Sequence, residues 1–102
     1  MDWKRSENRA LINALLALKN DTEVRHFLRD LMTEGEISEF AKRLQAADLL
    51  SDGVSYSDIV KKTGLSSTTV ARVSKWLKGK EGGYRTVIAR LHHHSIPIAR
   101  GG

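Results

Sequence analysis

Apolar side chains recur along this chain at the spacing of an α-helix. The clearest run follows the pattern i, i+3, i+4, i+7 and i+8: Val24, Phe27, Leu28, Leu31 and Met32. Such spacing gathers the side chains on one face of a helix. The chain contains a single proline, Pro97, and little alternation of β-branched residues. The sequence therefore predicts an all-α fold.

Helix-capping residues divide the chain into about six helices. The expected helices cover about residues 4–18, 21–32, 33–52, 55–63, 66–78 and 84–91. Asp21 is the expected N-cap of the second helix. Thr33 and Glu36 have the spacing of a capping box, which predicts the start of the third. Gly53 is the expected C-terminal stop of that helix.

Two further expected helices carry apolar stripes that should be buried. The stripe of the first helix consists of Leu11, Ile12, Leu15, Leu16 and Leu18. The stripe of the third consists of Ile37, Phe40, Ala41, Leu44, Ala47 and Leu50. A chain of 102 residues buries only about 60–70% of the surface that it exposes when unfolded. Such a chain can fold alone, but a homodimer would help, because a second copy could cover the first two helices, which are rich in leucine and phenylalanine.

Composition limits the class of protein. The length predicts one helical domain, residues 1–91, followed by a flexible tail, residues 92–102. The chain has no cysteine, which excludes disulfides and thiolate metal sites. No apolar run approaches the roughly 20 residues that span a bilayer, and the first ten residues are charged rather than apolar. We expect a soluble, cytoplasmic protein without a membrane partner.

Positive charge is concentrated in residues 53–80. The formal net charge of the whole chain is +5. Residues 53–80 carry six Lys or Arg against one Asp, whereas residues 1–52 carry eight against ten acidic residues. A basic cluster of this kind attracts phosphate backbones. An ordinary solvated helix face can have the same composition, so charge alone does not assign a function.

The pattern of residues 55–78 is typical of a helix-turn-helix. Gly64 separates two short helical stretches, and the second opens with the small hydroxyl residues "SSTT" at 66–69. Ser66 or Ser67 is the expected N-cap. In a helix-turn-helix the N-terminal part of the second helix enters the major groove of DNA. Two alternatives remain open: a packing unit within a helical bundle, and an interaction module that docks onto another protein.

The hydroxyl residues and the cations of this region are candidate contacts to double-stranded DNA. Short side chains at Thr68 and Thr69 would let the helix approach base edges, and Arg72 would reach a guanine edge or a phosphate. Lysines nearby, Lys80 among them, would contact phosphates whatever the base sequence. The predicted DNA-binding residues are Lys61, Lys62, Ser66, Ser67, Thr68, Thr69, Arg72, Lys75 and Lys78.

Several sequence stretches together resemble the Trp-repressor superfamily, and in particular its YerC/YecD-like branch of TrpR-related proteins. They are "LMTEGEISEFAKRLQAADLLSDGVSYSDIVKKTGLSSTTVARVSKWL" and the following "GGYRTVIARL". The markers are "LLSDGVSY" at 49–56 and "TGLSSTTVARV" at 63–73. The resemblance implies an all-helical, intertwined homodimer whose two helix-turn-helix motifs face adjacent major grooves. It also implies a bacterial transcription regulator, with repression as the expected mode of action.

The resemblance also implies a place where tryptophan-responsive relatives hold their ligand. Their indole lies between two arginines that match Arg43 and Arg72, and the threonines of that site match Thr33 and Thr69. A serine of the ligand site is replaced by Trp76, which adds bulk where the ligand should lie. We therefore expect no response to tryptophan. Arg43 would instead pair with Glu39, four residues before it, and Arg72 would contact DNA. The alternative is an effector-responsive repressor that binds an amino-acid-like ligand between Arg43 and Arg72.

Other candidate sites have little support. The run "HHH", His92–His94, cannot offer all three side chains to one ion from a helix, because adjacent residues point about 100° apart. No second cluster of metal-ligating residues accompanies it, so neither a metal nor a cofactor is expected. No histidine has an evident orienting partner, and the sequence has no glycine-rich phosphate loop. The sequence does not predict an enzyme.

Overall fold

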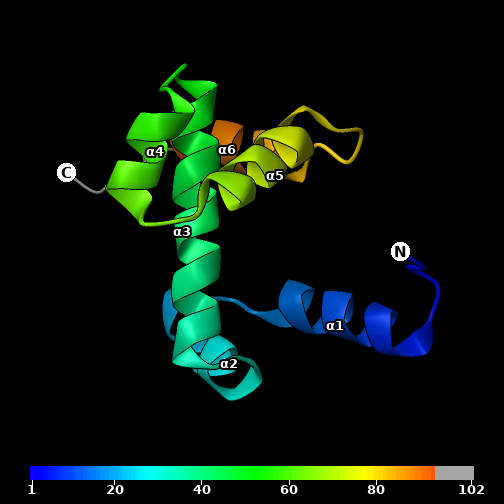
Figure 1. The fold of residues 1–102 in the computed structure, drawn as a ribbon. Coiled ribbons are helices and arrows are strands. Elements are labelled where there is room, and N and C mark those ends of the chain that lie inside the picture. The colour runs from blue at the N-terminus through cyan, green and yellow to red at the C-terminus, as the bar shows by residue number, and fades with distance from the viewer. Residues whose placement is uncertain (94–102) are drawn as a thin grey trace. The chain divides into compact units, whose positions relative to one another are not determined.

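The computed structural model describes residues 1–93, which form helices and contain no strand (Figure 1). The helices are α1 (Ser6–Ala17), α2 (Asp21–Leu31), α3 (Glu34–Ser51), α4 (Tyr56–Thr63), α5 (Ser67–Lys78) and α6 (Gly83–His93). The all-α fold predicted from the sequence is confirmed. Within the described residues, no helix is both long and apolar enough to cross a membrane.

The described residues pack as two compact units, residues 1–37 and the residues from Ser38 to His93. The boundary between them falls inside α3. The sequence predicted one helical domain over residues 1–91 and gave no sign of this division. Capping and periodicity report on helices one at a time, whereas a division into units depends on which helices pack against one another.

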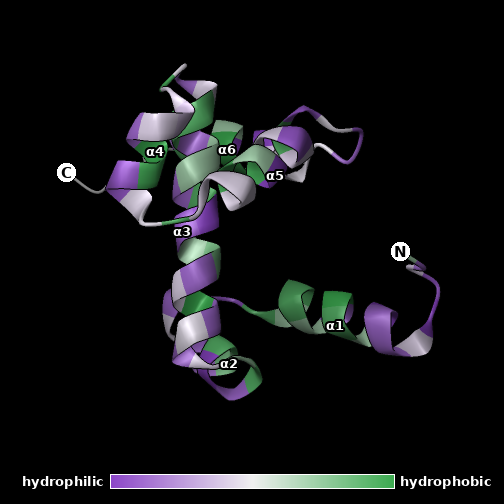
Figure 2. Ribbon diagram, in the orientation of Figure 1, coloured by the Kyte–Doolittle hydropathy of each residue, from purple (hydrophilic) through white to green (hydrophobic). Residues whose placement is uncertain are grey.

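The first unit has no interior of its own. Neither α1 nor α2 contains a buried residue. Leu15 is 46% exposed and Leu16 is 77% exposed, on a helix that is hydrophobic over much of its length (Figure 2). The side chain of Asn20 accepts a hydrogen bond from the Glu23 N–H, so Asn20 rather than the predicted Asp21 caps α2. The apolar face predicted for α1 exists, but a single chain does not cover it.

A reciprocal pair of hydrogen bonds begins α3. The Glu36 N–H donates to Thr33 Oγ1 at 3.1 Å, and the Thr33 N–H donates to Glu36 Oε1 at 2.9 Å. Two backbone N–H groups that the helix itself cannot satisfy are thereby paired. The capping box predicted from the sequence is confirmed. The hydrogen bond from the Thr33 backbone, with the Thr33 side chain second, lowers the pKa of the Glu36 carboxyl.

Replacing Thr33 with valine is expected to raise the pKa of Glu36 toward its ordinary value, because the loss of the hydroxyl loosens the capping box. A carboxyl whose pKa is lower in the folded state than in the unfolded state stabilises the fold above the unfolded value. That contribution is lost as the pH falls through the folded value, in the acid range. Titration of the Glu36 carboxyl carbon by NMR measures the shift. Equal pKa values in the wild type and in Thr33→Val would contradict this account.

The centre of the second unit is the part of α3 at residues 45–49. All five of these residues are buried: Gln45, Ala46, Ala47, Asp48 and Leu49. Five consecutive residues cover more than one full turn. Neighbours must therefore lie on every side, and α4, α5 and α6 surround this part of α3 (Figure 1). The other buried apolar residues are Ile59, Leu65, Val70, Val73, Leu77 and Ile88.

The apolar stripe predicted for α3 is correct only in part. Ala47 is buried, and Leu44 and Leu50 pack partly buried against the core. Phe40, however, is 47% exposed, and Ala41 is exposed as well. The prediction of this stripe assumed that neighbouring helices cover one face of α3 along its whole length. Here neighbouring helices cover α3 completely at residues 45–49. Toward the N-terminus of α3 this cover no longer reaches Ala41.

The last helix extends beyond its predicted end. α6 continues to His93, whereas the sequence predicted a flexible tail from residue 92. His92 Nε2 lies 2.8 Å from Oδ1 of Asp48, whose residue is fully buried in α3. This contact joins the end of α6 to the centre of the unit. His94 and the rest of the predicted tail lie outside the described residues. Among residues 1–93, no three His, Cys, Asp or Glu residues gather as a metal site would require.

Candidate nucleic-acid interface

Three residues fix the turn between α4 and α5. Gly64 has a φ of 78°, in the left-handed region that favours glycine, and its N–H donates to the Val60 carbonyl. The Thr63 hydroxyl donates to the Ile59 carbonyl at 2.7 Å and accepts from the Leu65 N–H at 3.1 Å. Gly64 was predicted from the sequence, whereas Thr63 was missed. A threonine directly before the glycine, with nothing to mark it as buried, carries no local signal of this role.

The hydroxyl residues at the start of α5 divide into two pairs. Ser66 is the N-cap: its Oγ accepts from the Thr69 N–H at 3.1 Å, and the two hydroxyls also lie 3.0 Å apart. Ser67 and Thr68 are exposed. The side chains of Ser66 and Thr69 are thus used to begin the helix. Ser67 and Thr68 remain available at its N-terminal end, where backbone N–H groups and the helix dipole favour phosphate.

One face of α5 packs into the core and the opposite face is exposed. The buried face consists of Val70, Val73, Ser74 and Leu77. Arg72 and Lys75 are exposed. Ser74 is only 4% exposed, so this small polar side chain also lies on the packed face. The helices α4 and α5 therefore pack together and present the candidate DNA contacts on their outer side.

The cations of α4, of α5 and of the loop that follows α5 are exposed, and they lack acidic partners among residues 1–93. Lys61, Lys62, Lys75, Lys78 and Lys80 are all exposed, as is Arg72. Ion pairs occur elsewhere in the described residues, at Arg5, Arg25, Arg29 and Arg43, and His92 contacts Asp48. Within residues 1–93, none involves a cation of α4, of α5 or of the loop that follows α5. No acidic side chain of residues 1–93 therefore neutralises their charge.

Of the residues predicted to hold a ligand, the structure brings Arg43 and Trp76 together. Arg43 Nε donates to Glu39 Oε2 at 3.1 Å, which is the pair predicted from the sequence. The Arg43 guanidinium carbon also lies 5.7 Å from the centre of the Trp76 ring. Arg72 is exposed on the outer side, and Thr69 is engaged with Ser66. Thr33 belongs to the first unit, residues 1–37, and is described only within it.

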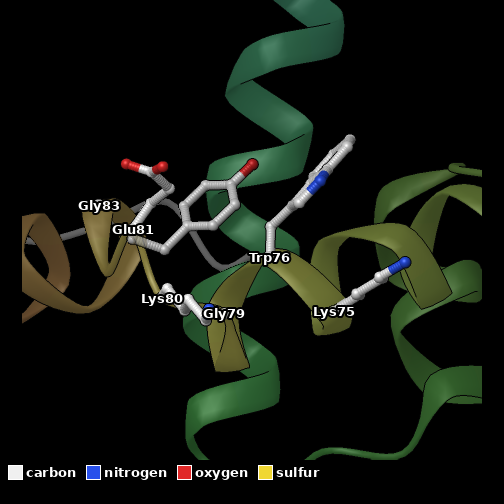
Figure 3. A pocket seen from close by; sticks show the side chains of 7 residues that line it. Lys75, Trp76, Gly79, Lys80, Glu81 and Gly83 are labelled. Carbon is white, nitrogen blue, oxygen red and sulfur yellow. The ribbon is translucent and has the colours of Figure 1, made fainter. Parts of the chain in front are cut away.

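A cavity of about 510 Å³ lies at the C-terminal end of α5 (Figure 3). Its lining consists of Lys75, Trp76, Gly79, Lys80, Glu81, Gly83 and Tyr84. Of the predicted ligand residues, only Trp76 contributes to it. Burial raises the pKa of the Tyr84 hydroxyl, and the positive charge of Arg43 opposes that rise. The lining residues all fall within residues 75–84, but the sequence did not reveal this cavity because it depends on how α6 packs against α5.

The helix-turn-helix, packed on a central helix and exposing cations that have no ion pair among residues 1–93, has the architecture of a DNA-binding regulator. Comparison with known proteins narrows this class. Residues 6–92 match the family described as Trp repressor protein, so the chain belongs to the Trp repressor family. This is a family of regulators rather than of enzymes, and the resemblance noted in the sequence is confirmed.

Individual relatives agree with this assignment. The chain is 36% identical over 81 residues to the uncharacterized protein YerC of Bacillus subtilis, covering 79% of this chain and 78% of that protein. A TrpR-like protein from Eubacterium eligens superposes with a TM-score of 0.82 at 35% identity, covering 88% of this chain and 93% of the other. A Staphylococcus aureus protein provisionally named a Trp repressor gives 0.80 at 28% identity, covering 97% and 99%.

Proposed function

We propose that this protein is a sequence-specific DNA-binding transcriptional regulator that acts as a repressor in the cytoplasm. The carrying observation is the exposed, unpaired set of cations around α5, at whose N-terminal end Ser67 and Thr68 are also exposed. Exposed lysines without acidic partners attract phosphate, and a helix N-terminus with short side chains can enter a major groove. Membership of a family of DNA-binding regulators supports the same function.

The residues of the interface take different roles in this proposal. Ser67, Thr68 and Arg72 contact base edges and carry the sequence preference. Ser66 and Thr69 hold the end of the helix in shape through their mutual hydrogen bonds. The lysines contact phosphates and orient the protein on the duplex without reading sequence: Lys61, Lys62, Lys75 and Lys78.

The acting form in this proposal is a homodimer. The support is the first unit, in which α1 and α2 bury no residue and α1 exposes a row of leucines. Large apolar surfaces that a single chain leaves exposed are typical of an interface between protomers. A symmetric dimer presents two copies of α5 to half-sites about 34 Å apart along the DNA.

The protein does not use tryptophan as a corepressor in this proposal. The support lies at Arg43, whose Nε is bonded to Glu39 and whose guanidinium lies under the Trp76 ring. A planar ligand would have to displace Trp76 to reach that arginine. An effector-responsive repressor that binds between Arg43 and Arg72 is the competing proposal, and the same experiment distinguishes the two.

A salt titration of DNA binding tests the proposed function. DNA fragments are first selected from a genomic library, and binding is then measured by fluorescence anisotropy from 50 to 200 mM salt, in the presence and absence of L-tryptophan. Log K should fall with log salt with a slope of about −0.9 per phosphate contact, and tryptophan should not change the curve. A flat dependence, or no selected DNA, would favour a protein-docking module. Tighter binding in tryptophan would favour the effector-responsive repressor.

A further inference from the structure

An arginine with two aromatic neighbours joins α3 to α5. The guanidinium carbon of Arg43 lies 5.5 Å from the centre of the Phe40 ring and 5.7 Å from that of the Trp76 ring. Its Nε donates to Glu39 Oε2 at 3.1 Å. Phe40, Glu39 and Arg43 stand on α3, whereas Trp76 stands on α5. We call these four residues the Arg43 clamp.

The contacts with Phe40 and Glu39 hold the guanidinium from the side of α3 and present it to Trp76 on α5. A cation within about 6 Å of a ring centre is attracted by the electrons of that ring, and the attraction is strongest for tryptophan. The ion pair with Glu39 restrains the arginine, whose side chain is 29% exposed. Arg43 therefore offers Trp76 an ordered partner rather than a mobile surface side chain.

Trp76 is placed where its contact controls the orientation of α5. Trp76 follows Arg72 by four residues, so the two side chains project from the same side of α5, one turn apart. A rotation of α5 about its axis that removes Trp76 from Arg43 also moves Arg72. Because Trp76 is 47% exposed, core packing alone does not hold its ring in place.

We propose that the Arg43 clamp holds α5 in its DNA-binding orientation without any ligand, with Arg43 and Trp76 as positioning residues. The inference rests on the proposed function, because it concerns the helix that would read DNA. The clamp uses side chains of the chain itself to fix α5 against α3. DNA binding is accordingly constitutive with respect to small molecules.

The test compares clamp variants in a Trp3→Phe background, which leaves Trp76 as the single tryptophan of the two in the chain. Acrylamide quenching of Trp76 and amide hydrogen exchange over residues 67–78 report on the clamp without DNA, and anisotropy reports DNA affinity. Arg43→Met should raise quenching and exchange, and it should lower DNA affinity by about 3- to 10-fold, the range expected for one or two exposed cation–π contacts. Arg43→Lys, which keeps the cation, should retain most of the wild-type behaviour.

Matched variants separate positioning from charge and from folding. Lys42→Met removes the same charge from the neighbouring position of α3, which is exposed, and should leave quenching and exchange unchanged. Trp76→Phe should keep most of the DNA affinity, whereas Trp76→Leu should lose it to the extent of Arg43→Met. None of these residues belongs to the buried core, so circular dichroism should show folded protein in each case.

Two results would overturn the clamp: Arg43→Met with wild-type quenching and exchange, or equal losses of DNA affinity in Arg43→Met and Lys42→Met. Failure of the proposed function looks different. A wild-type protein that binds no DNA would refute that function, while quenching and exchange would still decide whether Arg43 and Trp76 order α5.

Discussion

Replacing Arg72 with alanine should lower affinity for a selected DNA site by about 5- to 150-fold and should flatten the difference between that site and unrelated DNA. Arg72 is exposed one turn beyond the helix start that Ser66 caps, and no acidic side chain of the described residues pairs with it. Its guanidinium is thus available for a guanine edge. Anisotropy with the selected site and with a scrambled duplex measures both effects.

The controls for Arg72 distinguish reading of sequence from attraction to phosphate. Arg90→Ala removes the same charge from an exposed position of α6 and should change binding little. Lys78→Ala should weaken binding to all duplexes alike and reduce the salt slope by about 1. Thr68→Ala should relax the preference without changing that slope. If Arg72→Ala and Arg90→Ala behaved alike on both duplexes, α5 would not be the recognition helix.

The helix-turn-helix could be predicted from the sequence because its signals are local. A serine at the N-cap accepts a hydrogen bond from the backbone N–H three residues later, and a glycine at the C-terminal end lets the chain turn. Both act through neighbouring backbone atoms. The structure confirms these roles for Gly64 and Ser66, and Ser55 caps α4 in the same way. The pairing of Arg43 with Glu39 was also predictable, because residues four apart on a helix are neighbours.

Contacts between distant segments could not be predicted in the same way. Arg43 and Trp76 are more than thirty residues apart, and the contact of His92 with Asp48 spans 44 residues. The sequence placed Trp76 where a ligand should lie but did not identify its contacts; in the structure its ring centre lies 5.7 Å from the guanidinium carbon of Arg43. Asp48 interrupts the apolar pattern of α3 and would ordinarily be assigned to the surface, yet it is fully buried. The partner of Asp48 is His92, in the run His92–His94. The local sequence pattern did not indicate that α6 extends into this run.

The exposure of Phe40 shows a different limit of sequence patterns. Periodicity correctly indicates that an apolar side chain belongs to a stripe, but it does not say whether the same chain supplies the cover. Phe40 and the leucines of α1 were both expected to be buried, and both are exposed in one chain. From the sequence alone, the apolar residues of the first two helices led to the expectation of a homodimer. The exposed fractions of Leu15 and Leu16 now identify residues whose replacement tests that expectation.

Replacing Leu15 and Leu16 together with glutamate should convert the proposed dimer to monomers. Leu16 is 77% exposed and α1 buries no residue, so in an isolated chain these changes remove little packing. In a dimer they would place two charges in an apolar interface, which is strongly unfavourable without partners. Sedimentation measures the mass, and circular dichroism should show loss of helix from α1 and α2, because a short helix without tertiary packing is marginal in water.

DNA binding provides the second readout of the same variant. Two reading heads on one molecule bind the second half-site at high effective concentration, which can raise affinity by about 10²- to 10⁴-fold. The monomeric variant should lose an amount of this order on a two-fold symmetric site and much less on a single half-site. The control is Ala10→Glu with Ala17→Glu, which adds the same charge at exposed positions of α1 away from the leucines. A wild type that sediments as a monomer would contradict the dimer, as would equal losses in the two double variants.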